Sequence, residues 1–292
     1  MTHPEQLKPL WSYHAGAGER IWQFQFTDTG DLVGQKRSKA NQQPIARFFS
    51  IEARTGQLLC DNYLLQDGNP PVPVGESWFT GIETTAGALA ICHAAQQGSP
   101  EHLGIWAIDF RQPHPCWSRP DLAFVANTPE GLLCSLTTSF AGFPERRFYL
   151  VDPRSGALLE QPDDTRANSL RQQAPSEAER QQIALPERTV NQEQHPVVEH
   201  TGTATRPLSR QTEGQICETI PVTNGAITVI HRQNNSDGSW TSTIELHHRN
   251  HCRYTDTIQH ASPFPVTDNF LVRQGILYYC RQDEHLVALA LP

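Results

Sequence analysis

A degenerate phrase recurs along this chain and limits its possible folds more than any other feature. Its copies are Ser50–Gly56 (SIEARTG), Ala107–Phe110 (AIDF) and Leu150–Gly156 (LVDPRSG), with the acidic positions spaced 57 and 43 residues apart. Each copy reads as a short apolar strand followed by an acidic residue, and two of them continue into a turn closed by Thr-Gly or Ser-Gly. This is the local chemistry of a tight β-hairpin. Repetition at such a period predicts an array of similar small sheets.

Weaker copies extend the pattern to six units, at Val197–Gly202, Thr243–His248 and Leu286–Leu291. We therefore predict an all-β fold, a six-bladed β-propeller of four-stranded antiparallel blades with seven blades as the alternative, formed by residues 1–292 as a single domain. The last unit is one strand short. We expect the N-terminal segment Pro9–Tyr13 to supply that strand and close the last blade, which removes two exposed sheet edges.

Residues 161–215 do not fit this pattern, because they are poor in large apolar residues and rich in Gln, Arg, Glu, Pro and Thr. We expect an irregular blade or a long insertion here. Ala178–Leu185 has the character of a short helix, and Ser176 with Glu179 has the spacing of a capping box. The segment is either a surface excursion or a lid that binds a partner.

Charge and composition exclude several classes of partner. The 292 residues carry a formal net charge of −8, which provides no basic field for nucleic acid or for an anionic membrane. The first residues lack the apolar run of a secretory signal, and no stretch approaches the ~20 apolar residues of a membrane span. We expect a cytoplasmic monomer. Its seven scattered cysteines contain no Cys-x-x-Cys pair, which favours reduced, structural thiols.

The recurring phrase resembles the quinoprotein-type β-propeller repeat, Ala-x-Asp-x-x-Thr-Gly-x-x-x-Trp, among the quinoprotein-like and WD40-like repeat proteins. Ala107, Asp109 and Trp117 match its first, third and last positions, while Gln112 and Pro113 replace Thr-Gly. The quinone-dependent dehydrogenases of that superfamily are usually eight-bladed and exported. Since this chain is shorter and shows neither an export signal nor their adjacent-cysteine pair, we expect no cofactor.

The chain also resembles an uncharacterised bacterial family of similar length and unknown function. In that family a Trp-containing strand is followed by a Pro-Glu-His-x-Gly-Ile segment, represented here by Trp78 and Pro100–Ile105. This resemblance implies the fold and brings no activity with it.

Propellers bind ligands where their inner strands converge, and two of the expected inner strands are Arg20–Trp22 and Glu76–Trp78. Trp22 and Trp78 have the character of a stacking wall, with Arg20 and Glu76 as its polar contacts. Packing between neighbouring blades accounts for the same tryptophans without a ligand.

A second set of candidate residues has the chemistry of acid/base catalysis. Glu101 and His102 lie in an expected loop, and His93 ends the strand before it. A carboxylate beside an imidazole is the raw material for general acid/base work. The alternative is that Glu101 or His102 bonds to the backbone and fixes the loop.

Potential metal ligands are densest in His247–Cys252 (HHRNHC), with His260 nearby. Zinc needs about four converging ligands, whereas neighbouring residues on a strand point to opposite faces. We therefore expect a solvated hairpin here and no metal.

Two functions follow from these observations. The first is a non-catalytic binding or scaffold module that recognises a protein or small ligand at the channel mouth, with no strongly coupled acid/base pair. The alternative is an enzyme of the hydrolase or lyase type, with its site in the central channel. It requires at least two of the side chains of His93, Glu101 and His102 to face a common pocket.

Overall fold

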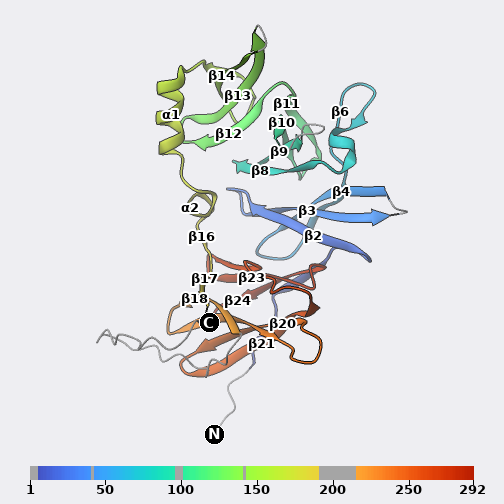
Figure 1. Ribbon diagram of the computed structural model, residues 1–292, viewed down its shortest axis with the longest axis vertical. Helices are drawn as coiled ribbons and strands as arrows, with labels where there is room; N and C mark the ends of the chain where they lie inside the picture. Colours follow the sequence, from blue (N-terminus) through green and yellow to red (C-terminus); the bar gives the residue numbers. More distant parts are fainter. Residues whose placement is uncertain (1–5, 41–42, 96–100, 141–142, 191–214) are drawn as a thin grey trace. The chain divides into compact units, whose positions relative to one another are not determined.

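The structure is a computed structural model that describes residues 6–40, 43–95, 101–140, 143–190 and 215–292 (Figure 1). In these residues strands dominate, joined by two short α-helices and one 3-10 helix. The chain divides into two compact units, residues 15–181 and residues 1–14 with 182–292. We describe each unit by itself.

The unit of residues 15–181 contains three four-stranded antiparallel meanders. Sheet I comprises β2 (Glu19–Phe26), β3 (Asp31–Ala40), β4 (Gln43–Glu52) and β5 (Leu58–Tyr63). Sheet II comprises β8 (Thr80–Ala86), β9 (Leu89–Ala95), β10 (His102–Asp109) and β11 (His114–Arg119). Sheet III comprises β12 (Ala123–Thr128), β13 (Gly131–Phe140), β14 (Phe143–Val151) and β15 (Leu158–Glu160). In the sequence, sheets I and II are joined by a two-stranded ribbon and a 3-10 helix. The ribbon comprises β6 (Gln66–Asp67) and β7 (Val72–Pro73), and the helix is η1 (Val74–Ser77).

Two helices complete this unit, α1 (Asp164–Gln173) and α2 (Glu177–Gln181). Helix α1 buries Ala167 and Leu170 in a cluster with Leu133 and Leu150 of sheet III. Helix α2 begins with the predicted capping box, in which the Ser176 backbone N–H donates to Glu179 Oε2 at 2.8 Å and the Glu179 N–H donates to Ser176 Oγ at 3.3 Å. The irregular segment therefore begins with two helices, and the helix predicted over Ala178–Leu185 is shorter than expected, because it ends at Gln181 before a strand at Ile183–Ala184.

The other unit contains two five-stranded antiparallel sheets. Sheet IV comprises β17 (Glu187–Val190), β18 (Gln215–Val222), β19 (Gly225–Gln233), β20 (Trp240–His248) and β21 (His251–Ser262). Sheet V comprises β16 (Ile183–Ala184), β22 (Phe270–Arg273), β23 (Ile276–Arg281), β24 (His285–Ala290) and β1 (Trp11–His14). Strand β1 pairs with β24 from Trp11 opposite Ala288 to His14 opposite His285. The N-terminal segment thus completes the C-terminal sheet, as the sequence predicted.

Four-stranded antiparallel sheets are confirmed, whereas six blades and the closure of a ring are not. The described residues hold five sheets of four or five strands and one two-stranded ribbon. The expected copy at Val197–Gly202 lies outside the described residues. Strands β16 and β17 lie between α2 and that copy in the sequence. They pair with β22 and β18, respectively, as additional edge strands.

The recurring acidic residue forms a turn, as its repetition suggested. The Gly56 and Gly156 backbone N–H groups donate to the carbonyls of Glu52 and Asp152 at 2.9 and 2.8 Å. Both glycines have positive φ, 77° and 68°, which side chains disfavour. The copy at Ala107–Phe110 lacks this glycine. Its Asp109 carboxylate nevertheless accepts the Arg111 N–H at 2.9 Å, much as the Asp152 carboxylate accepts the Arg154 N–H at 2.7 Å. A capped turn is what the copies share.

The cysteines are free thiols, five of them buried. Burial raises the pKa of the Cys134 thiol to about 12, which makes it a small hydrophobic group. None of the helices in the described part of the chain has the length and apolar character needed to span a bilayer.

Sheet I contains a buried lysine, Lys36, whose side chain is only 2% exposed. Its ammonium donates to the Ala15 carbonyl at 2.6 Å and lies 2.8 Å from Glu19 Oε2 and 2.9 Å from Asp61 Oδ1. Three acceptors thus meet the three donors of the ammonium, which is the condition for burying such a charge.

Lys36→Met should therefore lower the free energy of unfolding by about 3 kcal/mol, since it leaves two carboxylates without their shared cation. Urea denaturation measures the change. The matched control is Lys39→Met at an exposed position of the same strand, which should change stability by less than ~0.5 kcal/mol. Equal stabilities for the two variants would contradict this role of Lys36.

Candidate functional site

Three neighbouring strands of sheet II bring Glu83, His93 and His102 together. Alternation along β8 places Gly81 and Glu83 on one face; His93 on β9 pairs opposite Gly81, and His102 on β10 pairs opposite Ala95. All three side chains consequently share a face. A β-bulge between Ile82 and Thr84 leaves Glu83 outside the regular ladder. We call these three residues the Glu83 cluster.

The two imidazoles of the Glu83 cluster share one carboxylate oxygen. Glu83 Oε1 lies 2.5 Å from His102 Nδ1 and 3.1 Å from His93 Nδ1. The rings are stacked, with centroids 3.5 Å apart and planes inclined by 10°. His93 lies over Gly81, where a Cβ would come within 2.6 Å of its Cε1, so only glycine leaves room for this ring. The sheet backbone thereby fixes His93.

Burial and charge act in opposite directions on Glu83. Burial alone raises the pKa of its carboxyl, but the hydrogen bonds and positive charge of His93 and His102 outweigh burial and hold the pKa below its ordinary value. The side chains of Glu83 and His93 are 14% and 11% exposed, whereas that of His102 is 44% exposed. The cluster therefore joins a buried carboxylate to an imidazole that solvent reaches.

This arrangement suits proton transfer. A carboxylate that accepts the proton of His102 Nδ1 selects the tautomer in which Nε2 is an acceptor, and it stabilises the imidazolium that forms once Nε2 takes up a proton. The carboxylate that contacts His102 here is Glu83, which the sequence did not reveal. A carboxylate two residues after a glycine on the neighbouring strand was the only signal for it.

The same three residues can gather around a metal ion, since their ligand atoms lie within 4.8 Å of one another. Zinc binds imidazole nitrogen at about 2.1 Å and close to the ring plane. An ion at that distance from both Nδ1 atoms would lie far outside both planes, because the rings are nearly parallel and 3.5 Å apart. Proton transfer fits this geometry better than metal binding.

A second cluster contains the two tryptophans predicted as a stacking wall. The Arg37 Cζ atom lies 4.2 Å from the ring centroid of Trp22 and 4.9 Å from that of Trp78. Arg37 donates from Nε to Gln35 Oε1 at 3.1 Å and from Nη2 to the Thr80 carbonyl at 3.2 Å. Burial lowers the pKa of Arg37. The tryptophans thus meet through a fixed guanidinium that the sequence did not reveal.

The remaining predicted contacts lie differently. Arg20 is exposed and pairs across the ladder with Arg37. The expected inner strand at Glu76–Trp78 is wrong: Glu76 belongs to η1 and has a left-handed φ of 52°, and β8 begins only at Thr80. Glycine at position 75 starts this reversal with a φ of 57°, which breaks any strand.

Thr80 and Gly81 connect the two clusters. The Thr80 carbonyl accepts from Arg37, and the next residue, Gly81, lies beneath His93. Gln23 approaches the same position, since its Nε2 would be 3.0 Å from a Cβ at Gly81. The Trp22–Arg37–Trp78 surface and the Glu83 cluster are accordingly neighbours within one unit.

At the C-terminal ends of β2 and β8, the first strands of sheets I and II, helix α2 hydrogen-bonds to side chains and backbone. Glu177 Oε1 accepts from Thr84 Oγ1 at 2.7 Å, Arg180 donates to Thr85 Oγ1 at 2.9 Å, and Gln181 Oε1 accepts the Phe26 N–H at 2.8 Å. Asn127 of β12 also donates to Thr84 Oγ1, at 2.9 Å. This end of β2, β8 and β12 is filled by the chain itself.

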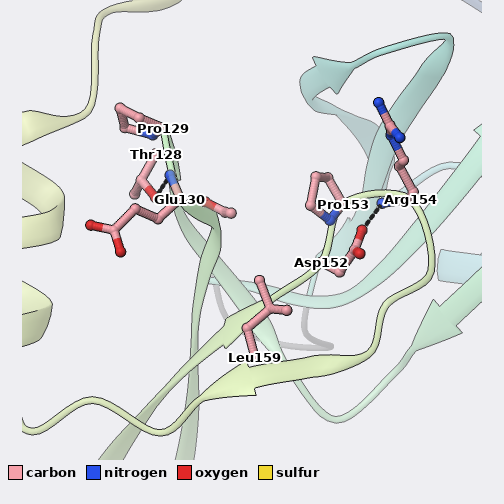
Figure 2. Close-up of a pocket in the computed structure, with 8 residues that line it drawn as sticks. Thr128, Pro129, Glu130, Asp152, Pro153, Arg154 and Leu159 are labelled. Atoms are coloured by element: carbon pink, nitrogen blue, oxygen red, sulfur yellow. Dashed lines mark hydrogen bonds between the residues drawn. The ribbon is translucent and has the colours of Figure 1, made fainter.

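A shallow cavity of about 290 Å³ lies elsewhere, between two turns of sheet III (Figure 2). Figure 2 shows Thr128 and Glu130 from one turn and Asp152 and Arg154 from the other, with Leu159 between them. The polar groups are used locally: Asp152 caps the Arg154 N–H, and Glu130 Oε2 lies 2.5 Å from the guanidinium of Arg166. The cavity therefore lacks the acid/base chemistry of the Glu83 cluster.

Sheet IV contains a Ser-His-Glu arrangement that the sequence did not reveal. His231 Nδ1 lies 2.7 Å from Ser242 Oγ, and His231 Nε2 lies 3.1 Å from Glu218 Oε2. Burial alone raises the pKa of Glu218, but hydrogen bonds from His231 and the Asp268 N–H hold it below its ordinary value. Ser242 and His231 have zero exposure, so no substrate reaches them. We assign this triad to stability.

The histidine-rich segment is the predicted hairpin. Arg249 and Asn250 adopt left-handed φ values of 49° and 65°, and His248 pairs with His251 across the turn. His247 Nε2 bonds to Glu245 Oε2 at 3.0 Å. In the part of the chain that the structure describes, metal-capable groups of three form instead at the Glu83 cluster and at His14, Glu284 and His285.

Comparison with known proteins gives no family for this chain. No family model matches it, and no curated protein matches it. The resemblance to quinoprotein-like repeats and to the bacterial family of unknown function is therefore not confirmed beyond an antiparallel β-rich fold.

Several solved structures match over nearly the whole chain at low similarity. A glycosyl hydrolase from Bacteroides ovatus is 10% identical, with 99% of this chain and 94% of that chain covered and a TM-score of 0.28. A protein from Bacteroides thetaiotaomicron VPI-5482, named as a candidate glycosidase, is 9% identical, with 98% and 93% covered and a TM-score of 0.32. BBS1N in complex with ARL6DN is 9% identical, with 99% and 98% covered and a TM-score of 0.27. At these TM-scores, no site of theirs is transferred to this chain.

The expectation of a non-catalytic binding or scaffold module is wrong. That function required the absence of a coupled acid/base pair, and the Glu83–His102 contact of 2.5 Å is such a pair. The alternative drawn from the sequence replaces the first expectation.

His102→Ala should raise the pKa of Glu83, since it removes a hydrogen bond and a cationic partner. A depressed carboxyl pKa adds stability that is present above the unfolded value of about 4.3 and is lost as the pH falls through the folded value. The variant should lose part of that gain, so its deficit in stability should be fully present above the unfolded value and should fade as the pH falls through the folded value. Carbon-detected NMR of the Glu83 carboxyl and urea unfolding at each pH measure both effects. An unchanged Glu83 titration would contradict the coupling, and His251→Ala, at an exposed hairpin position, is the control.

Ser242→Ala should lower the free energy of unfolding by ~1–2 kcal/mol, because His231 Nδ1 loses its partner in a fully buried setting. Any hydrolytic activity of the protein should survive this change. Thermal unfolding and an activity assay on the same preparation test both statements. Loss of activity in a fully folded variant would show that the triad is catalytic.

Proposed function

We propose that this protein is a hydrolase in which the Glu83–His102 pair is the general base. The observation that carries the proposal is the 2.5 Å contact between Glu83 Oε1 and His102 Nδ1, with the side chain of Glu83 14% exposed and that of His102 44% exposed. In this proposal His102 Nε2 takes a proton from water as the water attacks the substrate, and Glu83 stabilises the imidazolium that forms. A lyase would use the same base on a C–H proton. The exposure of His102 favours water as the proton donor.

His93 has a positioning role in this proposal. Its ring stacks on that of His102, and its Nδ1 lies 3.1 Å from the same carboxylate oxygen. Since Gly81 leaves His93 no freedom to move toward the sheet, the ring sets the plane in which His102 lies. The base is consequently preorganised by the strands around it.

The Trp22–Arg37–Trp78 surface is the proposed substrate-binding region. Trp22 is 62% exposed, so one indole face is open to a flat or ring-shaped group, whereas Arg37 holds the other elements of the surface in place. Arg20, Glu76 and Glu101 are exposed, and they belong to the proposed substrate contacts. Thr80 and Gly81 connect this surface to the base.

The proposal keeps the architecture and setting expected from the sequence: a single propeller domain over residues 1–292, six blades, closure by the N-terminal strand, and a cytoplasmic monomer with a small-molecule substrate. Support comes from the antiparallel meanders, from the pairing of β1 with β24 and from the free cysteines, which suit a reducing compartment.

The test is a panel of 4-nitrophenyl esters, phosphates and glycosides, with release of 4-nitrophenolate measured from pH 5 to 9. For whichever substrate is turned over, Glu83→Gln should lower kcat/KM by ~10²- to 10³-fold, since the amide keeps the shape but not the charge that supports the imidazolium. Trp22→Ala should mainly raise KM.

The matched control is Glu245→Gln, which alters another Glu–His pair, 3.0 Å from His247, in the other unit. It should leave kcat/KM unchanged. Full activity in folded Glu83→Gln, or equal losses in the two variants, would refute the assigned base.

A further inference from the structure

The first and last strands of the chain present two histidines and a glutamate to one another in sheet V. His14 ends β1 and pairs in register with His285, the first residue of β24. Glu284 immediately precedes His285, in a turn where its N–H donates to the Arg281 carbonyl at 3.1 Å. The ligand atoms of the three side chains lie within 4.8 Å of one another, and His14 Nε2 is 3.9 Å from Glu284 Oε2.

The ring geometry here differs from that of the Glu83 cluster in the way that matters for metal binding. The rings of His14 and His285 have centroids 4.5 Å apart and planes inclined by 61°. Lone pairs in inclined planes can converge on one point, whereas those of nearly parallel stacked rings cannot. Glu284 adds a carboxylate oxygen within 4.8 Å of a ring nitrogen of each histidine.

One nitrogen of this group has an unsatisfied requirement. His285 Nδ1 is buried and has no hydrogen-bond partner among the residues that the structure describes, a state that costs free energy unless a donor or an ion is supplied.

We propose that His14, Glu284 and His285 bind one divalent transition-metal ion of the zinc class. Two imidazoles and a carboxylate are ligands that zinc accepts in tetrahedral sites, with water in the fourth position. The side chains of His14 and Glu284 are 46% and 40% exposed, which leaves a path for the ion and for that water. The ion fastens β1, a strand of only four residues, to the C-terminal sheet.

The experiment uses the full chain with any affinity tag removed, stripped with a chelator and titrated with zinc chloride by calorimetry. We expect one zinc ion per chain and a rise in Tm of about 5 °C at one hundred times Kd. Hydrogen exchange at the β1 amides should slow when zinc is added. At the same zinc concentration, His14→Ala should weaken the affinity at least ~10-fold and reduce both effects to about half or less.

Three variants complete the design. Glu284→Gln replaces His14→Ala if circular dichroism shows that the latter is unfolded, and it should also weaken zinc binding. His251→Ala, at an exposed position of sheet IV, should bind as the parent chain does. His102→Ala should also bind normally, which separates this site from the Glu83 cluster and from the proposed hydrolase activity. Absence of zinc binding, unchanged binding by folded His14→Ala, or loss of binding in His102→Ala would each overturn the proposal.

Discussion

The ladder of antiparallel hydrogen bonds within short meanders determines everything else in this molecule. Because side chains alternate strictly between the two faces of a sheet, residues far apart in sequence meet whenever their strands pair in register. Glu83, His93 and His102 come together in this way on three adjacent strands, as do Glu218, His231 and Ser242. Polar clusters arise here without any long catalytic loop.

What separates these clusters is exposure and ring orientation, not residue type. The His231 triad has the same kinds of groups as a hydrolytic site, but zero exposure of Ser242 and His231 closes it to substrate. The Glu83 cluster keeps one imidazole in contact with solvent while its carboxylate is largely shielded from solvent, and this difference suits the proposed general base. Inclined rings at His14 and His285 suit an ion instead.

The sequence predicted local structure well where its signal was a turn or a cap. The acidic residues at 52, 109 and 152, the Ser176–Glu179 capping box and the pairing of the N-terminal strand with β24 are all confirmed. It failed at Glu76–Trp78, where left-handed backbone after Gly75 replaces a strand.

The sequence was equally unable to identify Glu83 and Arg37, whose roles come from cross-strand register. Neither residue lies in a motif. Each can be identified only once its neighbours in the fold are known. These neighbours are strands β9 and β10 for Glu83, and the segment that contains Trp78 for Arg37. Contacts of this kind depend on pairing partners that composition does not encode.

Helix α2 has a consequence for how this chain can change over evolution. Its residues Glu177, Arg180 and Gln181 bond to side chains or backbone of β2 and β8, and Asn127 of β12 shares Thr84 with Glu177. A substitution at one of these positions alters the hydrogen-bonding requirements of residues in other parts of the unit. Substitutions at these three helical positions therefore constrain which substitutions the strands can accept. In homologous chains, the helical positions and their partners on the strands should vary as a correlated set.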